Sequence, residues 1–166
     1  YHKKADTDHA EVVALKKAKD KAWGAELYVT LEPCDHFGKT PPCVDAIIKS
    51  GIKKVIIAMI DPNPTTCGCG VERLKKAGIS VRTGVSKDEA VKLNHKYIKF
   101  MKTGFPYVTV KLAESLDGKI AARDGSSKWI TCDASRKYAR GIRSNMDAVM
   151  VGINTVLNDD PFLLDQ

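Results

Sequence analysis

Residues 27–43 read LYVTLEPCDHFGKTPPC, and this stretch decides the expected fold. Its first five residues are apolar or β-branched and predict a buried strand over 27–31. Residues 32–42 are rich in proline, glycine and polar side chains, which indicates a loop. A helix is expected to begin near Pro42 and to stop at Gly51, because proline suits the first turn of a helix and glycine the position after its end.

The same alternation of elements extends on both sides of this stretch. Upstream, residues 9–22 are rich in helix formers and place apolar side chains at helical spacing. Downstream, strands are expected over 54–60 and 79–83, and they alternate with helices over 71–77 and 87–101. Strands that alternate with helices in this way predict an α/β layered sheet.

The pattern restarts in the last third of the chain. Strands are expected over 107–113 and 148–151, with a helix between them that Asp133 opens as its N-cap. We therefore expect two domains, residues 1–103 and residues 107–166. The second is too short to close a core of its own, so we interpret it as the first part of a larger α/β domain.

The net charge, the apolar content and the cysteine count limit the classes of function that the chain can have. The chain has 166 residues, and its 27 Lys and Arg against 20 Asp and Glu give a net charge of +7. This surplus fits anionic partners such as phosphates, or a solvated lysine-rich surface. No apolar run approaches the ~20 residues of a transmembrane helix, and no signal peptide is visible. Five cysteines without a secretory signal favour the cytoplasm, and the two ends predict a fragment cut on both sides.

Four side chains have the chemistry of a hydrolytic metal centre. His9 begins the first helix, Cys34 follows the first strand, and Cys43 opens the next helix. One imidazole and two thiolates suit tetrahedral Zn²⁺ and leave a fourth position for water. Glu11 lies two residues from His9 and need not be a ligand. It can accept a proton from the zinc-bound water and return it to a leaving amine.

His-x-Glu followed by Pro-Cys and a second cysteine is the signature of zinc deaminases. We therefore expect hydrolytic deamination of an amino-substituted heterocycle. Two alternatives stay open: a tRNA or nucleoside deaminase with the same zinc chemistry, which the charge of +7 would fit, and a zinc-stabilised segment without catalysis. Eight residues between the cysteines, where the signature has two, and an aromatic content of 7% argue against the tRNA alternative.

The spacing of the cysteines and the segment GKTPPC at 38–43 resemble the bifunctional RibD family of riboflavin biosynthesis proteins. The resemblance continues through DPNP at 61–64, KTG at 102–104, KLA at 111–113, SLDGK at 115–119, SKWIT at 127–131 and TVLNDDP at 155–161. It implies a cytidine-deaminase-like α/β/α layered domain, followed by the start of a dihydrofolate-reductase-like α/β domain.

The resemblance also implies two activities. The first domain would deaminate a diaminohydroxyphosphoribosylaminopyrimidine with Zn²⁺. In the full protein, the second would use NADPH to reduce 5-amino-6-(5-phosphoribosylamino)uracil to the ribitylamino product. The expected partner is therefore a phosphorylated pyrimidine, with no nucleic acid and no membrane, and the protein is expected to be a homo-oligomer.

By the same resemblance, His9, Cys34 and Cys43 hold zinc and Glu11 carries the proton. Cationic, donor or polar groups near the zinc site are expected to bind the substrate: His2, His36, Lys39, Asp61 and Asn63. In the second domain, substrate contacts fall on Ser127, Arg143 and Leu163, and NADPH contacts on Ala113, Trp129, Thr155 and Asp159. Lys39 and Arg143 also fit solvated surface positions, and Trp129 also fits a core position.

Overall fold

The computed structural model describes residues 7–64 and 66–163, so the predicted contact His2 lies outside the described residues. The chain divides into two compact units, the first ending at Tyr107 and the second beginning at Val108. Among the described helices, none combines the length and the apolar character needed to cross a bilayer.

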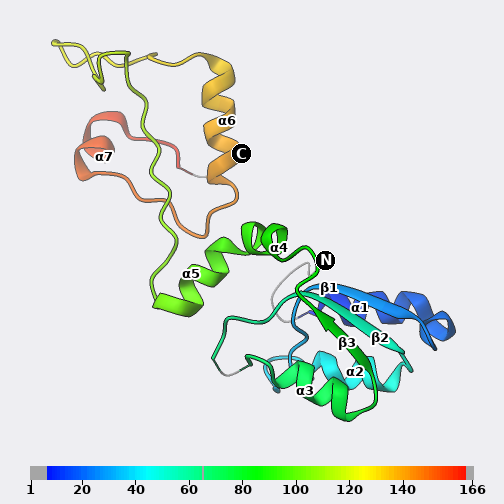
Figure 1. The fold of residues 1–166 in the computed structure, drawn as a ribbon. Coiled ribbons are helices and arrows are strands. Elements are labelled where there is room, and N and C mark those ends of the chain that lie inside the picture. The colour runs from blue at the N-terminus through cyan, green and yellow to red at the C-terminus, as the bar shows by residue number, and fades with distance from the viewer. Residues whose placement is uncertain (1–6, 65, 164–166) are drawn as a thin grey trace. The chain divides into compact units, whose positions relative to one another are not determined.

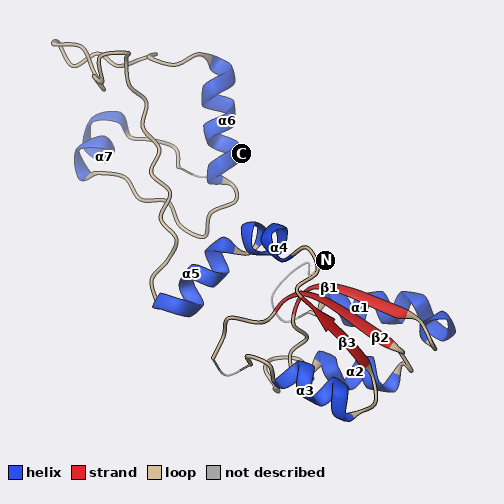
Figure 2. Ribbon diagram, viewed as in Figure 1, coloured by secondary structure: helices blue, strands red, loops and turns tan. Residues whose placement is uncertain are grey.

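The first unit is built on a parallel sheet of three strands (Figures 1 and 2). β1 (Glu26–Leu31), β2 (Lys54–Met59) and β3 (Ser80–Thr83) lie in the order β1-β2-β3. In this register Tyr28 lies opposite Ile56 in the neighbouring strand. The sequence had placed strands over the same three stretches, and parallel strands joined by helices give the expected α/β class.

Three helices share one core with the sheet. They are α1 (Ala10–Ala18), which continues into a 3₁₀ turn over Lys19–Ala22, α2 (Cys43–Lys49) and α3 (Cys69–Lys76). Leu15 and Ala18 of α1 are partly buried and pack against the buried cluster. The 3₁₀ turn, α2, α3, the sheet and the adjoining loops supply its members: Ala22, Val44, Ile47, Ile52, Val55, Ile57, Val71, Leu74 and Ile79. Each fully buried valine, leucine or isoleucine stabilises the fold by about 1.5–3 kcal/mol.

The central strand β2 is buried on both faces. Val55 and Ile57 point to the helix-covered face and are fully buried, while Ile56 points to the opposite face and is also buried. α4 (Lys87–Leu93) packs against β2 and buries Ala90. This continuous burial is why β2 carries an unbroken apolar sequence where β1 alternates.

The helix expected over 87–101 is two helices. α4 ends at Leu93 and α5 runs over His95–Thr103, so the prediction of one long helix was wrong. The break lies at Asn94, whose side-chain amide donates to the carbonyl of Ala90 at 2.9 Å. Such local bonding by asparagine competes with regular helix geometry, and this explains the interruption.

The second unit contains α6 (Asp133–Arg143) and α7 (Ile153–Asp159). The strands expected over 107–113 and 148–151 do not form within the described residues. An extended segment becomes a strand only when a neighbouring strand satisfies its backbone groups, and these segments pair with no described strand. The N-cap of α6 is Cys132 rather than Asp133, which is instead the first helical residue.

Candidate metal centre

Three potential metal ligands meet beside the carboxyl end of β1. His9 directly precedes α1, Cys34 follows the strand, and Cys43 is the first residue of α2. Nδ1 of His9 lies 3.0 Å from Sγ of Cys43 and 3.6 Å from Sγ of Cys34. All three ligand atoms lie within 4.8 Å of one another, so residues far apart in the sequence converge on one point.

A hydrogen bond joins the two thiols. The hydrogen bond from the Cys43 thiol lowers the pKa of Cys34 to about 5, and the backbone N–H of Cys43 also donates to this sulfur at 3.3 Å. Because Cys43 donates this hydrogen bond, its own pKa is raised. The lowered pKa of Cys34 favours its thiolate form, which is the form that binds a metal.

The donor set fits Zn²⁺. Bond lengths of about 2.3 Å to sulfur and about 2.0–2.1 Å to nitrogen put neighbouring tetrahedral ligands roughly 3.6–3.8 Å apart. The observed separations of 3.0 and 3.6 Å need only small adjustments to reach that geometry. Cys43 is buried, while His9 and Cys34 are partly exposed, so the centre lies where solvent and a substrate can reach it.

Glu11 lies in the first turn of α1, close to this cluster. Its negative charge contributes to the raised pKa of Cys43, which places the carboxylate within electrostatic reach of that thiol. Its side chain is half-buried at the same end of the helix as His9. A partly shielded carboxylate beside the ligands has the position required of a general acid and base.

Glu32 is a functional candidate that the sequence reasoning missed. Its side chain is buried, and its two carboxylate oxygens accept backbone N–H groups from Asp61 at 3.2 Å, Gly68 at 3.0 Å and Val71 at 3.0 Å. The carboxylate thereby fastens the loop after β2 and the start of α3 to the segment that leads into Cys34. A charged residue between an apolar strand and Pro33-Cys34 is the signal that could have indicated it.

The predicted substrate residues of this unit have different environments. His36 and Lys39 are exposed on the loop before α2, and Nδ1 of His36 lies 3.4 Å from Oγ1 of the buried Thr66. Asp61 is buried, and its Oδ1 accepts the Tyr97 hydroxyl at 2.8 Å and the backbone N–H of Asn63 at 2.9 Å. Asp61 is thus already engaged in shaping the turn that presents Asn63.

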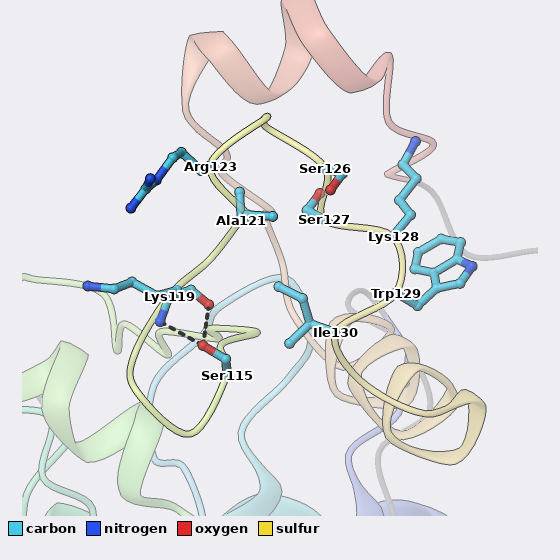
Figure 3. Close-up of a pocket in the computed structure, with 10 residues that line it drawn as sticks. Ser115, Lys119, Ala121, Arg123, Ser126, Ser127, Lys128, Trp129 and Ile130 are labelled. Atoms are coloured by element: carbon cyan, nitrogen blue, oxygen red, sulfur yellow. Dashed lines mark hydrogen bonds between the residues drawn. The ribbon is translucent and has the colours of Figure 1, made fainter.

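A cavity of about 590 Å³ in the second unit includes two predicted contacts, Ser127 and Trp129 (Figure 3). Figure 3 shows Lys128 and Trp129 on one side of it and Lys119 and Arg123 on the other. Trp129 is 69% exposed in this unit, and the Arg136 guanidinium carbon lies 4.4 Å from the centre of its ring. The described lining residues do not include Ala113 or Thr155.

Of the other five predicted contacts of this unit, only Arg143 and Leu163 interact with each other in the described structure. Nη1 of Arg143 donates to the backbone carbonyls of Phe162 at 3.2 Å and Leu163 at 3.4 Å, so Arg143 and Leu163 are brought together. Asp159 ends α7, and its Oδ1 lies 4.0 Å from Nζ of Lys128. Thr155 is exposed on the same helix, and Ala113 is half-buried.

Each of the two units contains a segment that matches a known protein family. Residues 1–59 match the family model of the cytidine and deoxycytidylate deaminase zinc-binding region, and residues 106–165 match that of the RibD C-terminal domain. The riboflavin biosynthesis protein RibD of Aquifex aeolicus is 56% identical over 163 residues, which cover 98% of this chain and 46% of that protein.

Solved structures of RibD proteins also resemble this chain in sequence and fold. RibD from Acinetobacter baumannii matches with a TM-score of 0.93 and 51% identity, over 98% of this chain and 46% of that one. A diaminohydroxyphosphoribosylaminopyrimidine deaminase/5-amino-6-(5-phosphoribosylamino)uracil reductase from Thermotoga maritima matches with a TM-score of 0.85 and 49% identity, over 93% and 45% of the two chains. The α/β fold class is therefore confirmed. The chain spans about half the length of the RibD riboflavin biosynthesis proteins that it matches, and over that span its sequence and fold are similar to theirs.

Proposed function

We propose that the first unit is a zinc-dependent deaminase that acts on a diaminohydroxyphosphoribosylaminopyrimidine in riboflavin biosynthesis. The observation that carries this proposal is the convergence of His9, Cys34 and Cys43 within 4.8 Å, with Glu11 beside them. The reaction adds water to the carbon that bears the amino group and releases ammonia, so it needs a nucleophile, a proton acceptor and a proton donor.

The chain supplies the ligands and the proton carrier. When bound, Zn²⁺ lowers the pKa of a coordinated water to about 7 and so makes a nucleophile available at neutral pH. A carboxylate oxygen of Glu11 accepts the proton that this nucleophile loses. The same oxygen then gives the proton to the departing amino group, which leaves as ammonia. One residue thus acts first as base and then as acid.

Polar groups on the surrounding loops are proposed to hold the substrate. His36 and Lys39, with His2, bind its phosphate, and Asn63 faces the pyrimidine or ribose from the turn that Asp61 shapes. The exposed positions of His36 and Lys39 on the loop between the two cysteines support this assignment. Phosphate contacts made by charged side chains fix a substrate without taking part in its chemistry.

Replacing Lys39 by alanine should raise KM for the pyrimidine substrate about tenfold and leave kcat nearly unchanged, because a charged hydrogen bond to phosphate is lost in both ground and transition states. Steady-state kinetics of ammonia release measures both constants. Lys76→Ala, which removes an exposed lysine from the last turn of α3, is the matched control. An unchanged KM in Lys39→Ala would remove Lys39 from the phosphate site.

The second unit is proposed to contribute to the NADPH-dependent reductase. Ala113, Trp129, Thr155 and Asp159 would contact the nucleotide, and Ser127, Arg143 and Leu163 the substrate. The match to the RibD C-terminal domain supports this, and so does the cavity that Ser127 and Trp129 line. We further propose a homo-oligomer in the cytoplasm, where the five free thiols would stay reduced.

The deaminase proposal is tested by zinc analysis of the purified chain together with ammonia release from the phosphoribosylaminopyrimidine. We expect about one zinc per chain, and activity that chelation removes and zinc restores. Cytidine, and adenosine within tRNA, serve as competing substrates. Faster turnover of either one would replace this proposal with the nucleoside or tRNA alternative, and zinc binding without any ammonia release would leave only a structural metal.

A further inference from the structure

Arg73 of α3 makes two ion pairs beside the metal centre. Its Nη1 donates to Oδ1 of Asp35, and its Nη2 donates to Oδ1 of Asp45. Both carboxylates are well shielded, with side-chain exposures of 18% and 30%, while the arginine is 42% exposed. One guanidinium group therefore links two segments that are ten residues apart in the sequence.

These two segments are the ones that carry the cysteine ligands. Asp35 directly follows Cys34, and Asp45 lies in the first turn of α2, which Cys43 begins. Two bonds already join the segments directly: the N–H of Val44 donates to the Cys34 carbonyl at 3.3 Å, and the N–H of Cys43 donates to the Cys34 sulfur at 3.3 Å. Arg73 adds a side-chain connection to these two hydrogen bonds.

Asp35 and Asp45 place two carboxylates within two residues of the cysteine ligands. A bound Zn²⁺ offsets the charge of the thiolates it holds, but the two carboxylates are additional negative charges close to them, and like charges repel. The guanidinium offsets the charge of both carboxylates, and its planar fork fixes the positions of the chain segments that bear them. An ammonium group is a single point charge and cannot hold both carboxylates in the same way.

We propose that Arg73 is a positioning residue for the metal centre, holding the Cys34 and Cys43 segments at the separation that Zn²⁺ requires by bridging Asp35 and Asp45. This inference rests on the proposed zinc site and deepens it. Arg73 is not one of the three converging ligands and its ion-pair partners are the two carboxylates, so its expected effect is on the affinity and geometry of metal binding. Residues that orient metal ligands typically change metal affinity by 10- to 100-fold when they are replaced.

The test measures the zinc affinity of the chain by competition with a chromophoric chelator. Arg73→Met keeps the aliphatic stem and should weaken zinc binding 10- to 100-fold. Arg73→Lys keeps the charge and should recover only part of that loss, because lysine cannot bridge both carboxylates. Lys54→Met is the matched control: it breaks the ion pair of Lys54 with Glu26 at 3.0 Å, away from the centre, and should leave the affinity unchanged.

A second readout separates positioning from general stability. Loading with Co²⁺ gives a thiolate-to-metal absorption band, and Arg73→Met should shift or weaken this band while Lys54→Met leaves it as in the wild type. Wild-type affinity and an unaltered band in Arg73→Met would overturn the inference, and so would full recovery in Arg73→Lys. Absence of zinc binding by the unmodified chain would instead refute the proposed zinc site, so the two failures are distinguishable.

Discussion

Glu11→Gln should lower kcat for ammonia release by a factor of about 10²–10⁴ and leave the zinc content unchanged. Glutamine has the size and shape of glutamate, but it cannot accept a proton from the nucleophile and pass it to the leaving amine. Because Glu11 is not one of the three converging ligands, the metal should stay in place. Ammonia release by a coupled assay and zinc by atomic absorption measure the two quantities.

The control for this prediction is Glu89→Gln. Glu89 is an exposed glutamate in the first turn of α4, as Glu11 is in the first turn of α1. Its substitution should change neither kcat nor zinc content. A Glu11→Gln variant with wild-type kcat would show that another group carries the proton. A variant that loses zinc would show instead that Glu11 helps to hold the metal.

Gly70→Ala should lower the free energy of unfolding of the first unit by about 3 kcal/mol. Alanine normally stabilises a helix relative to glycine by about 1 kcal/mol, so the expected effect has the opposite sign. The reason is space: a Cβ at this buried position in α3 would lie 2.1 Å from the carbonyl oxygen of Pro33. That oxygen belongs to the main chain next to Cys34, so relief of the clash moves a metal ligand and should also weaken zinc binding.

Urea unfolding followed by circular dichroism measures this change. Gly38→Ala is the control in the same unit, because an added Cβ there would meet only the His36 ring, at an ordinary 3.9 Å. It should leave the stability within about 0.5 kcal/mol of the wild type. Equal stabilities for the two variants would mean that α3 and the Pro33 segment are less tightly packed than this arrangement requires.

Much of the first unit could be predicted from the sequence because its signals are local. β-branched runs marked β1 and β2, and Gly51, with a φ of +72°, ends α2 where the sequence placed the stop. The convergence of His9, Cys34 and Cys43 was also predictable, because a known ligand chemistry links residue types to spacing. Their roles as ligands stay a prediction until metal is measured.

The missed features depend on contacts between distant residues. Glu32 binds backbone groups 29 to 39 positions away, and no local pattern shows which N–H groups a buried carboxylate will meet. The short helix α7 has a sequence rich in β-branched and asparagine residues, which have weak helix propensity, and so it was not predicted. The prediction of strands in the second unit was wrong for a related reason. A strand forms only when a partner strand satisfies its backbone groups, and the sequence of one strand does not show whether that partner is present.

The ligand spacing has a consequence for how the molecule assembles. His9 and Cys43 are 34 positions apart, and Cys34 lies between them, so every ligand comes from an early stretch of the chain that ends before β2. The entropic cost of closing a loop grows only with the logarithm of its length, and these loops are short. Since β1 pairs with β2, the ion could bind as soon as these two strands, α1 and α2 are in place, before β3 adds to the sheet, and metal binding would then favour an early step of folding.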